Sequence, residues 1–386
     1  MSETTNFDCL LVGGGLQNAL IAMGLLAQKP ATRFALIERD QRLGGNHLWC
    51  FHERDLPPEA RAFVDPLVAH RWPAYEVLFP ELTRRMDVAY LGITSDRLHE
   101  VVLQRVAASA GSTVFFGAAV AEVTASSVAL ADGRTLHGTL VVDSRGPERL
   151  QPPGRVAYQK FLGLELALAE PRPDFLPRLM DADVPQTDGY RFVYTLPLAA
   201  DRFMVEDTYY ADGPHLDRDK LRSEILAYAQ RIGLRVSGVV REETGVLPLT
   251  SRSLGNPVRD GVIVGGYAGG WFHPTTGYSF PVALRLARHL ASADLRQPFG
   301  KPWQELVERR QSQAKYFNLL NRFLFGAIPP IERRNAFQLF YRQPDEMILR
   351  FYAMDVTLAD RLRMFVGRPP RGLSLKAALA ALLARP

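Results

Sequence analysis

Two adjacent acids, Glu206 and Asp207, stand in a run of alternating character from Arg202 to Tyr210 that predicts a β-strand. Neighbouring residues on a strand point to opposite faces, so Glu206 shares its face with Met204 and Thr208 but not with Asp207. If that face meets an apolar tunnel, loss of water raises the pKa of the Glu206 carboxyl and keeps it protonated. The pattern therefore permits a buried proton donor, although the pair taken alone favours a solvated strand edge.

The element that could position a cofactor is a glycine-rich turn near the start of the chain. An apolar run, Phe7 to Val12, is followed by Gly13-Gly14-Gly15, a helical pattern, and a second apolar run that ends at Glu38. Such a strand–turn–helix–strand–acid unit places a pyrophosphate at the helix N-terminus and an adenosine ribose on the acid. We therefore predict a dinucleotide site. Asn18 replaces the third glycine of the motif, so the helix is expected to sit slightly further from the strand.

A second glycine-rich segment is predicted to approach the same ligand. The apolar run Gly261 to Val264 leads into a loop from Gly265 to Pro281 and then into a helix. A second helix N-terminus therefore points towards the ligand region. The residues after this strand are Gly265-Gly266-Tyr267, with no acid among them.

Composition predicts a soluble globular protein rather than one that spans a membrane several times. The 386 residues are 47% hydrophobic with a mean hydropathy of −0.08, and no run approaches the roughly 20 apolar residues that span a bilayer. The first residues do not resemble a secretory signal. Cys9 and Cys50 do not suggest a disulfide framework, so a reducing cytoplasm is expected. No metal site and no nucleic-acid partner are predicted.

Positive charge is concentrated at the end of the chain. Residues 301–386 contain 15 Lys and Arg against 7 Asp and Glu, whereas the whole chain carries a net charge of +5. This segment is also rich in aromatic residues. Composition favours an ordinary solvated basic face, and the alternative is contact with an anionic membrane surface. The stretch from Leu375 to Ala384 is expected to be a frayed tail, and a short amphipathic helix is the alternative.

Several stretches together resemble the bacterial lycopene β-cyclases over most of the chain, from Asp8 to about Tyr352. The stretches are Val12-Gly13-Gly14-Gly15-Leu16 with Glu38, Gly45-Asn46-His47 through His52, Val142-Asp143-x-Arg145-Gly146, Val205-Glu206-Asp207-Thr208, and Gly269-Gly270-Trp271-Phe272-His273-Pro274-Thr275-Thr276-Gly277-Tyr278. The last two are the most specific. The resemblance implies an α/β fold of the flavin hydroxylase (glutathione reductase-like) type with a Rossmann-like FAD-binding part. It also implies an antiparallel-sheet substrate domain and a helical C-terminal region.

The domain prediction is discontinuous. The FAD-binding domain is expected to comprise residues 1–73, 93–150 and 255–300, and the carotenoid domain residues 74–92 and 151–254. Residues 301–386 are expected to form a helical region that faces the membrane. The predicted cofactor contacts are Gly13, Gly15, Asn18, Glu38, Arg39, Gly44, Gly45, Asp143, Gly265, Gly269, Gly270 and Gly277. The predicted substrate contacts are Met204, Trp271, Phe272, His273 and Tyr278.

The implied reaction folds each open ψ-end of lycopene into a β-ionone ring without net redox change, giving γ-carotene and then β-carotene. It adds a proton at C2, forms the C1–C6 bond and removes the C6 proton. The resemblance implies Glu206 as the acid and Asp207 as a supporting group. We expect reduced FAD to be required, with its negative charge favoured by the second helix N-terminus. That anion would stabilise the cyclic carbocation or accept its proton. On this hypothesis NADPH or NADH serves only as the priming reductant. Flavoproteins usually carry Gly-Asp after the strand that ends at Val264, so the backbone amides of residues 268–270 are the remaining candidates to hold the ribityl chain.

Because lycopene and related acyclic carotenes are nearly insoluble, the resemblance also implies a cytoplasmic protein bound peripherally to the inner face of the membrane. Contacts with other carotenoid enzymes are a further expectation. Two alternatives stay open at this point. One is a flavin-dependent isoprenoid hydroxylase or desaturase, which would consume a nicotinamide cofactor stoichiometrically. The other is a non-catalytic carotenoid-binding subunit, whose function would survive Glu206→Gln.

Overall fold

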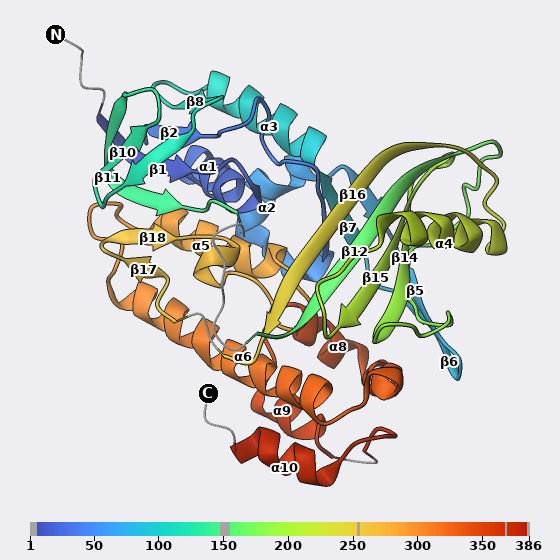
Figure 1. Ribbon diagram of the computed structural model, residues 1–386. Helices are drawn as coiled ribbons and strands as arrows, with labels where there is room; N and C mark the ends of the chain where they lie inside the picture. The colour runs from blue at the N-terminus through green and yellow to red at the C-terminus, as the bar shows by residue number, and fades with distance from the viewer. Residues whose placement is uncertain (1–5, 147–154, 253–254, 367–368, 384–386) are drawn as a thin grey trace.

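The computed structural model describes residues 6–146, 155–252, 255–366 and 369–383, and contains two large sheets with helices beside and below them (Figure 1). The first sheet has eight strands, in the order β17-β18-β11-β1-β2-β8, with β10 and β9 added beside β11. Its strands are β1 (Asn6–Val12), β2 (Phe34–Ile37), β8 (Thr113–Phe115), β9 (Val120–Val123), β10 (Ser127–Leu130), β11 (Thr135–Asp143), β17 (Val258–Arg259) and β18 (Val262–Val264).

The centre of this sheet is parallel and buried on both faces. Strand β1 pairs in parallel with β11 and β2. Leu11 packs towards the helices, whereas Leu10 and Val12 pack towards the β9–β11 strands. A parallel strand covered on both sides needs a continuous apolar run, and the run before Gly13 supplies it. The helices nearest this sheet are α1 (Leu16–Gln28), α2 (Pro58–Val64), α3 (Ser95–Ala107) and α5 (Phe280–Ser292).

The second sheet has seven strands in the order β16-β12-β15-β14-β13-β5-β6 and is antiparallel except for the β13–β5 pair. Its strands are β5 (Tyr75–Phe79), β6 (Leu82–Met86), β12 (Arg155–Leu168), β13 (Arg178–Asp181), β14 (Tyr190–Ala199), β15 (Arg202–Ala211) and β16 (Val236–Thr250). One face is covered by α4 (Arg218–Arg231), which packs Ile225 and Ala229 into an apolar core of their own. The opposite face turns towards the first sheet and forms a wall of the cavity described below.

A small third sheet connects the two large ones. It contains β3 (Leu48–His52), β7 (Tyr90–Thr94) and β4 (His70–Trp72) in the order β3-β7-β4. Residues 75–86 therefore join the second sheet, whereas the chain from Tyr90 pairs with strands that precede residue 73. The domain limits proposed from the sequence stay a prediction, and those at residues 150 and 254 fall within 147–154 and 253–254, outside the described residues.

The C-terminal part is helical, as predicted. Its helices are α6 (Lys301–Gly326), α7 (Arg333–Phe340), α8 (Asp345–Tyr352), α9 (Leu358–Arg363) and α10 (Leu375–Leu383). Helix α6 runs below both sheets and contacts α5, β12 and β16 (Figure 1). The expectation of a frayed tail at the end of the chain is wrong, because residues 375–383 form the helix α10, which packs Ala378 against the protein and contacts α6. Within the described ranges, no helix is both long and apolar enough to cross a bilayer.

Candidate active site

The glycine turn after β1 is shaped by close backbone contacts. Gly13 has a φ of +95°, and a Cβ there would lie 3.0 Å from the carbonyl oxygen of Ser144. The N–H of Gly14 donates to Glu38 Oε2 at 2.6 Å. Gly15, in contrast, has no atom within 4 Å of the position a Cβ would take, and it lines a cavity. The turn therefore presents open space at Gly15, where a ligand can approach the backbone.

Asn18 holds this turn from behind. Its Nδ2 donates to the carbonyl oxygens of Val12 and Gly13, both at 2.9 Å, and its Oδ1 accepts from the Ser144 hydroxyl at 2.9 Å. The side chain is fully buried and does not line the cavity. The Asn18 side chain therefore supports the turn, and a contact between its backbone and the cofactor stays a prediction. Its three hydrogen bonds stabilise a turn that a third glycine would leave without them.

Other predicted cofactor residues surround the same region. Gly44 has a φ of +85° and donates its N–H to the Gly14 carbonyl at 2.9 Å, which ties the second glycine pair to the turn. Gly45 also has a positive φ, of +60°. Asp143 accepts two hydrogen bonds from the Arg145 guanidinium, at 2.9 and 2.6 Å, and one from the Arg145 backbone N–H at 3.2 Å. The direct contacts of these residues and of the exposed Arg39 with a cofactor stay a prediction.

The structure fits a dinucleotide at two helix ends. Helix α1 begins after Gly15 and α5 begins after Ser279, and both of these N-cap residues line the cavity. Neither end has a side-chain cap or an acid in its first turn. Backbone N–H groups at such ends attract negative charge. The residues present therefore suit a pyrophosphate at α1 and an anionic group near α5.

The glycine-rich loop after β18 is fixed by Arg310, a residue that the sequence analysis missed. Its guanidinium donates to the carbonyls of Gly269, Gly270 and Gly255, at 2.6, 3.1 and 2.7 Å, and lies over the Trp271 ring. Arg310 is 5% exposed on the inner side of α6. A charged residue on the apolar face of a long helix was the available signal. Gly269 and Gly270 are thus held from below by the C-terminal region.

Tyr267 and Gly265, in the loop after β18, make contacts that fix the shape of this loop. Tyr267, which stands where an acid was expected, donates its hydroxyl to the Gly277 carbonyl and stacks on Phe272 with ring centres 4.2 Å apart. A Cβ at Gly265 would lie 2.1 Å from Ser144 Oγ, so only glycine fits there. Gly277 has a φ of +69° and lines the cavity. The Tyr267 side chain therefore closes the loop at Gly277 and faces the cavity.

His273 and Phe272 do not reach the cavity, so their predicted substrate contacts do not fit the structure. His273 Nδ1 accepts from the N–H groups of Thr275 and Thr276, and its Nε2 donates to the Phe351 carbonyl at 3.0 Å. Burial lowers the pKa of His273 to about 3, so the ring is neutral. It shapes the loop. Three other predicted substrate contacts, Met204, Trp271 and Tyr278, do line the cavity.

A cavity of about 370 Å³ joins the glycine turn to the second sheet. One end is lined by Gly15, Tyr267 and Gly277, and the other contains Glu206. Between them the wall is largely aromatic, which no sequence motif had indicated because the rings come from separate elements. These rings are Trp49, Tyr90, Phe161, Phe192, Tyr194, Tyr210, Tyr278 and Tyr352. The hydroxyls of Tyr90 and Tyr194 are hydrogen-bonded at 2.7 Å.

Glu206 is placed as a neutral acid in this cavity. Its Oε1 accepts a hydrogen bond from the Thr208 hydroxyl at 2.7 Å. Burial raises the pKa of Glu206 to about 8, and the nearby charges of Glu243 and Asp207 act in the same direction. The carboxyl group is therefore mainly protonated at neutral pH. Of the two alternatives predicted for Glu206, the structure therefore favours a carboxyl group that faces a cavity over one at a solvated strand edge.

Asp207 lies on the opposite face of β15, away from the cavity. It accepts hydrogen bonds from Arg191 Nε at 2.8 Å and Nη2 at 2.7 Å, and one from the Tyr209 hydroxyl at 3.3 Å. Its side chain is fully buried between β14 and α4. Of the two predicted catalytic acids, only Glu206 can therefore touch a ligand in the cavity. Asp207 can act only as a support, through the strand and through its charge.

A second acid of the cavity, Glu243, was missed. It lies on β16, is 6% exposed, and its Oε1 is 3.1 Å from His47 Nδ1. His47 is half-exposed and lines the same cavity. The sequence offers no local signal for this contact, because the two residues are 196 positions apart.

The fold and the cavity define a class of protein that resembles FAD-dependent monooxygenases. A crystal structure of a probable FAD-dependent monooxygenase from Pseudomonas aeruginosa superposes with a TM-score of 0.63 at 19% identity, covering 88% of this chain and 100% of that one. This likeness concerns the fold.

The sequence identifies the family within that fold class. Residues 8–378 match the family model described as lycopene cyclase protein, so the chain belongs to that family. It is 42% identical over 371 residues to a lycopene beta-cyclase of Pseudescherichia vulneris, covering 94% of each chain. It is 40% identical over 382 residues to a lycopene beta-cyclase of Pantoea ananas, covering 98% of each. The predicted family is thereby confirmed.

Proposed function

We propose that the chain is a lycopene β-cyclase that converts the ψ-ends of lycopene into β-ionone rings without net redox change. The observation that carries the proposal is Glu206, a carboxylic acid held protonated in a cavity with aromatic walls. Membership of the lycopene cyclase family supports the same substrate class. The chemistry of a polyene cyclisation needs such a donor, because it must add a proton to an unactivated carbon.

The chain's own residues can carry each requirement of this reaction. Glu206 gives its proton to C2, and the C1–C6 bond then forms as the cation moves to C5. The π faces of Phe192, Tyr194 and Tyr278 can stabilise positive charge beside them. The buried walls keep water from capturing the cation as an alcohol. Loss of the C6 proton completes the ring and restores the proton balance.

FAD is the proposed cofactor, held at Gly15 and the N-termini of α1 and α5. In its reduced form it would supply a negative charge near the cation and no net electrons. The uncapped end of α5 supports a preference for that charge state. NADPH or NADH would then be needed only to reduce the flavin initially.

The test of this proposal is an anaerobic assay with purified flavoprotein reduced by dithionite and supplied with lycopene but no nicotinamide. We expect γ-carotene and β-carotene to accumulate over many turnovers, since the reaction consumes neither electrons nor oxygen. The same protein with oxidised flavin is the control and should be inactive. Complete absence of cyclised product from the reduced protein would contradict the proposal. A strict requirement for oxygen and stoichiometric nicotinamide would instead indicate a hydroxylase.

The pH dependence follows from the state of Glu206. Because the protonated form is the active one and its pKa is raised to about 8, kcat/KM should be constant below that pH. Above pH 8 it should fall about tenfold for each pH unit as the carboxyl group ionises. Initial rates between pH 6.5 and 9.5 measure this limb, with the flavin spectrum recorded at each pH as the control for folding. A rate that rises through this range would contradict the assignment of Glu206 as the acid.

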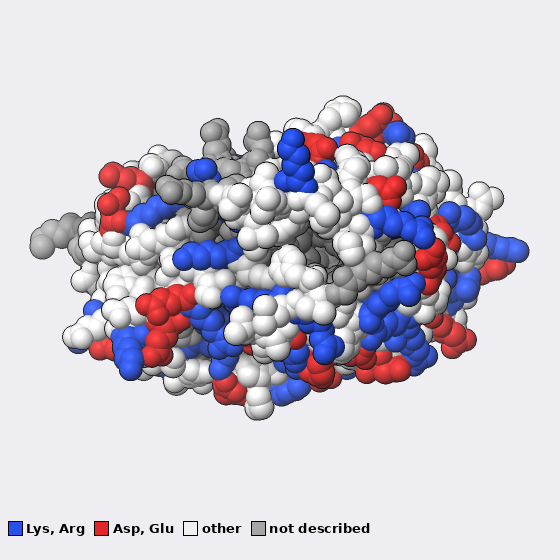
Figure 2. Space-filling view, turned by 90° about the horizontal axis from the view of Figure 1, so that it is seen from below, with Lys and Arg blue, Asp and Glu red and all other residues white. Residues whose placement is uncertain are grey.

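We further propose that the protein is cytoplasmic and meets the membrane through α9 and α10, at the surface formed by residues 358–366 and 369–383. Most of the exposed large hydrophobic side chains of the described residues lie there: Leu358, Leu362, Phe365, Val366, Leu375, Leu379, Leu382 and Leu383. The four leucines of α10 are 59–76% exposed, and Leu375, Leu379 and Leu382 recur at helical spacing. Lys and Arg side chains are interspersed with uncharged surface on the side of the molecule that carries these helices (Figure 2).

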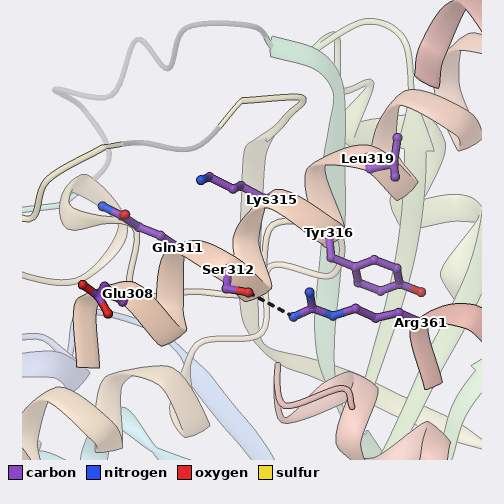
Figure 3. Close-up of a pocket in the computed structure, with 7 residues that line it drawn as sticks. All are labelled: Glu308, Gln311, Ser312, Lys315, Tyr316, Leu319 and Arg361. Carbon is purple, nitrogen blue, oxygen red and sulfur yellow. Dashed lines mark hydrogen bonds between the residues drawn. The ribbon is translucent and has the colours of Figure 1, made fainter. Parts of the chain in front are cut away.

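A basic hollow beside this surface supports the proposal. It has a volume of about 560 Å³ and lies between α6 and α9, and its charged lining residues are Lys315, Arg361 and one acid, Glu308 (Figure 3). The Arg361 guanidinium donates to Ser312 Oγ at 3.4 Å and lies over the Tyr316 ring. Cations next to exposed leucines suit the anionic headgroup and the acyl region of a lipid.

Deleting residues 301–386 would be a poor test of membrane contact, because α6 contributes the buried Arg310. We instead expect Leu379→Glu combined with Leu383→Glu to weaken sedimentation with phosphatidylglycerol-containing vesicles by about tenfold or more, since each leucine contributes about 1.5–3 kcal/mol when buried. Val240→Glu, at a residue 51% exposed on β16, is the matched control. Unchanged binding of the double variant would exclude α10 as the contact.

A further inference from the structure

Three strands of the second sheet place two acids in one row. Gly163 of β12 is paired with Glu206 of β15 on one side and with Glu243 of β16 on the other. Residues that stand opposite each other in neighbouring strands project from the same face of a sheet. Glu206 and Glu243 therefore point into the same cavity, and both line it. The three strands lie side by side in Figure 1.

The residue between the two acids is a glycine, which leaves the middle of the row without a side chain. A Cβ on Gly163 would lie 3.1 Å from Met204 Sδ and 3.5 Å from Glu206 Cβ. Adjacent strands are about 4.8 Å apart, so the Cα atoms of the two acids are separated by roughly 10 Å. Met204 Sδ therefore lies against the backbone between the two acids, and Glu206, Glu243 and Met204 all line the cavity in which a polyene end would be bound.

The two acids have different surroundings. Glu206 accepts a hydrogen bond from the neutral Thr208 hydroxyl. Glu243 has cationic or potentially cationic neighbours, with His47 Nδ1 3.1 Å from Oε1 and Arg241 Nη1 3.5 Å from Oε2. The two carboxyl groups therefore have chemically different partners, a neutral hydroxyl at Glu206 and an imidazole and a guanidinium at Glu243. Two carboxyl groups in different surroundings can serve as an acid and a base.

Other titratable groups near the row do not replace this pair. Cys50 of β3 and Tyr194 of β14 face Glu206, and burial raises the pKa of both side chains, so they stay neutral. Asp207 is on the far face of β15 with Arg191. Glu165 of β12 accepts a hydrogen bond from Arg241 Nε at 3.0 Å. Among the described residues that line the cavity, Glu243 is the acid with cationic partners.

The proposed cyclisation leaves a choice that such a base can make. After the C1–C6 bond forms, the cation at C5 can lose a proton from C6, from C4 or from the methyl group on C5. These losses give a β-ring, an ε-ring and a γ-ring respectively, all of the same mass. The family supplies no reason on its own why one of the three C–H bonds breaks. The position of a carboxylate beside C6 would decide it.

We propose that Glu243 is the base that removes the C6 proton and thereby directs the reaction to the β-ring. The proposal rests on the proposed cyclase function. In the balanced cycle, Glu206 O–H breaks as C2–H forms, and the C5=C6 electrons form C1–C6. The C6–H electrons then become the new C5=C6 bond while the proton passes to the Glu243 carboxylate. Transfer of that proton from Glu243 to Glu206, directly or through water, restores both groups.

The test compares Glu243→Gln, Glu243→Asp and the control Glu242→Gln. Glu242 is the neighbouring residue on the other side of β16, where its carboxylate pairs with Arg218 and Arg222. Each purified protein, with reduced flavin, is given lycopene, and the β-, ε- and γ-ring products are separated by chromatography. We expect Glu243→Gln to reduce the rate about a hundredfold and to release ε- or γ-ring ends. Glu243→Asp should retain β-rings, and Glu242→Gln should behave as the wild type.

The outcomes separate this inference from the proposed function. If Glu243→Gln forms only β-rings, whether fast or slowly, Glu243 does not determine which proton is lost from the cation. The same conclusion follows if both Glu243 variants are inactive although they are folded and bind the flavin. An inactive Glu243→Gln beside an Asp variant that makes β-rings would support its role as the base. If the wild-type protein forms no ring from lycopene, the proposed function itself fails.

Discussion

Glu206→Gln is expected to lower the rate of lycopene cyclisation by about 10²–10⁴-fold while the protein keeps its fold and its flavin. Glutamine has nearly the same size and can still accept the hydrogen bond of Thr208, which glutamate receives at 2.7 Å. It cannot, however, give up a proton to C2. Because burial holds Glu206 protonated, the substitution also removes no charge at neutral pH. The change therefore isolates proton donation from packing and electrostatics.

The measurement is the initial rate of γ-carotene formation, with flavin absorbance and thermal unfolding as evidence that the variant is intact. Glu206→Asp is the matched control, since it keeps an acid but withdraws it from the substrate, and some activity should return. A variant that cyclises lycopene at the wild-type rate would show that Glu206 is not the donor. It would also fit the alternative of a carotenoid-binding protein whose role does not depend on this acid.

Asp207→Asn is expected to destabilise the protein by about 3 kcal/mol and to leave the cyclisation rate of the folded fraction within a few-fold. Asp207 is fully buried and receives two hydrogen bonds from Arg191. Removing one charge of a buried pair leaves the other insufficiently compensated. Glu224 also contacts Arg191, which places the expected loss at the lower end of the range for such pairs. Equilibrium unfolding in urea measures the change.

The control for this second prediction is the double substitution Arg191→Met with Asp207→Leu. Replacing both members of a buried ion pair by apolar residues of similar size is often neutral for stability. The double variant should therefore recover most of the free energy of unfolding. If Asp207→Asn is as stable as the wild type but loses cyclisation as completely as Glu206→Gln, then Asp207 takes part in the chemistry itself. The assignment of a catalytic role to Glu206 and a supporting role to Asp207, which is based on the faces of β15 that they occupy, would then be wrong.

The cofactor unit was predictable because its information is local. An apolar run, three glycines, a helical pattern and Glu38 occur within about 30 consecutive residues, and each is required by the backbone geometry of that segment. The positive φ of Gly13 and the parallel pairing of β1 with β2 follow the pattern directly. Asn18 shows the limit of a motif, since its position matched a binding site whereas its hydrogen bonds serve the turn.

The glycine-rich loop was recognised, but the roles of its side chains were only partly predicted. Trp271 and Tyr278 line the cavity, whereas His273 bonds to Phe351 in α8 and Phe272 stacks on Tyr267. A loop of aromatic and polar residues does not specify which side chains turn inwards. That depends on the C-terminal helices, which arrive from elsewhere in the chain. The clamp by Arg310 is a contact of the same kind.

The sequence by itself determined that Glu206 and Asp207 face opposite sides of one strand, because the two-residue repeat of a β-strand allows nothing else. The sequence did not determine how each face of the strand would be covered and shielded from solvent. That was decided by the tertiary structure, in which the first sheet and the loop after β18 cover the face of Glu206, while α4 and Arg191 cover that of Asp207. The pairing of β12 with both β15 and β16 then set Glu243 across Gly163 from Glu206. Strand register and desolvation depend on residues far apart in the chain, so they appear only when the sheet is assembled.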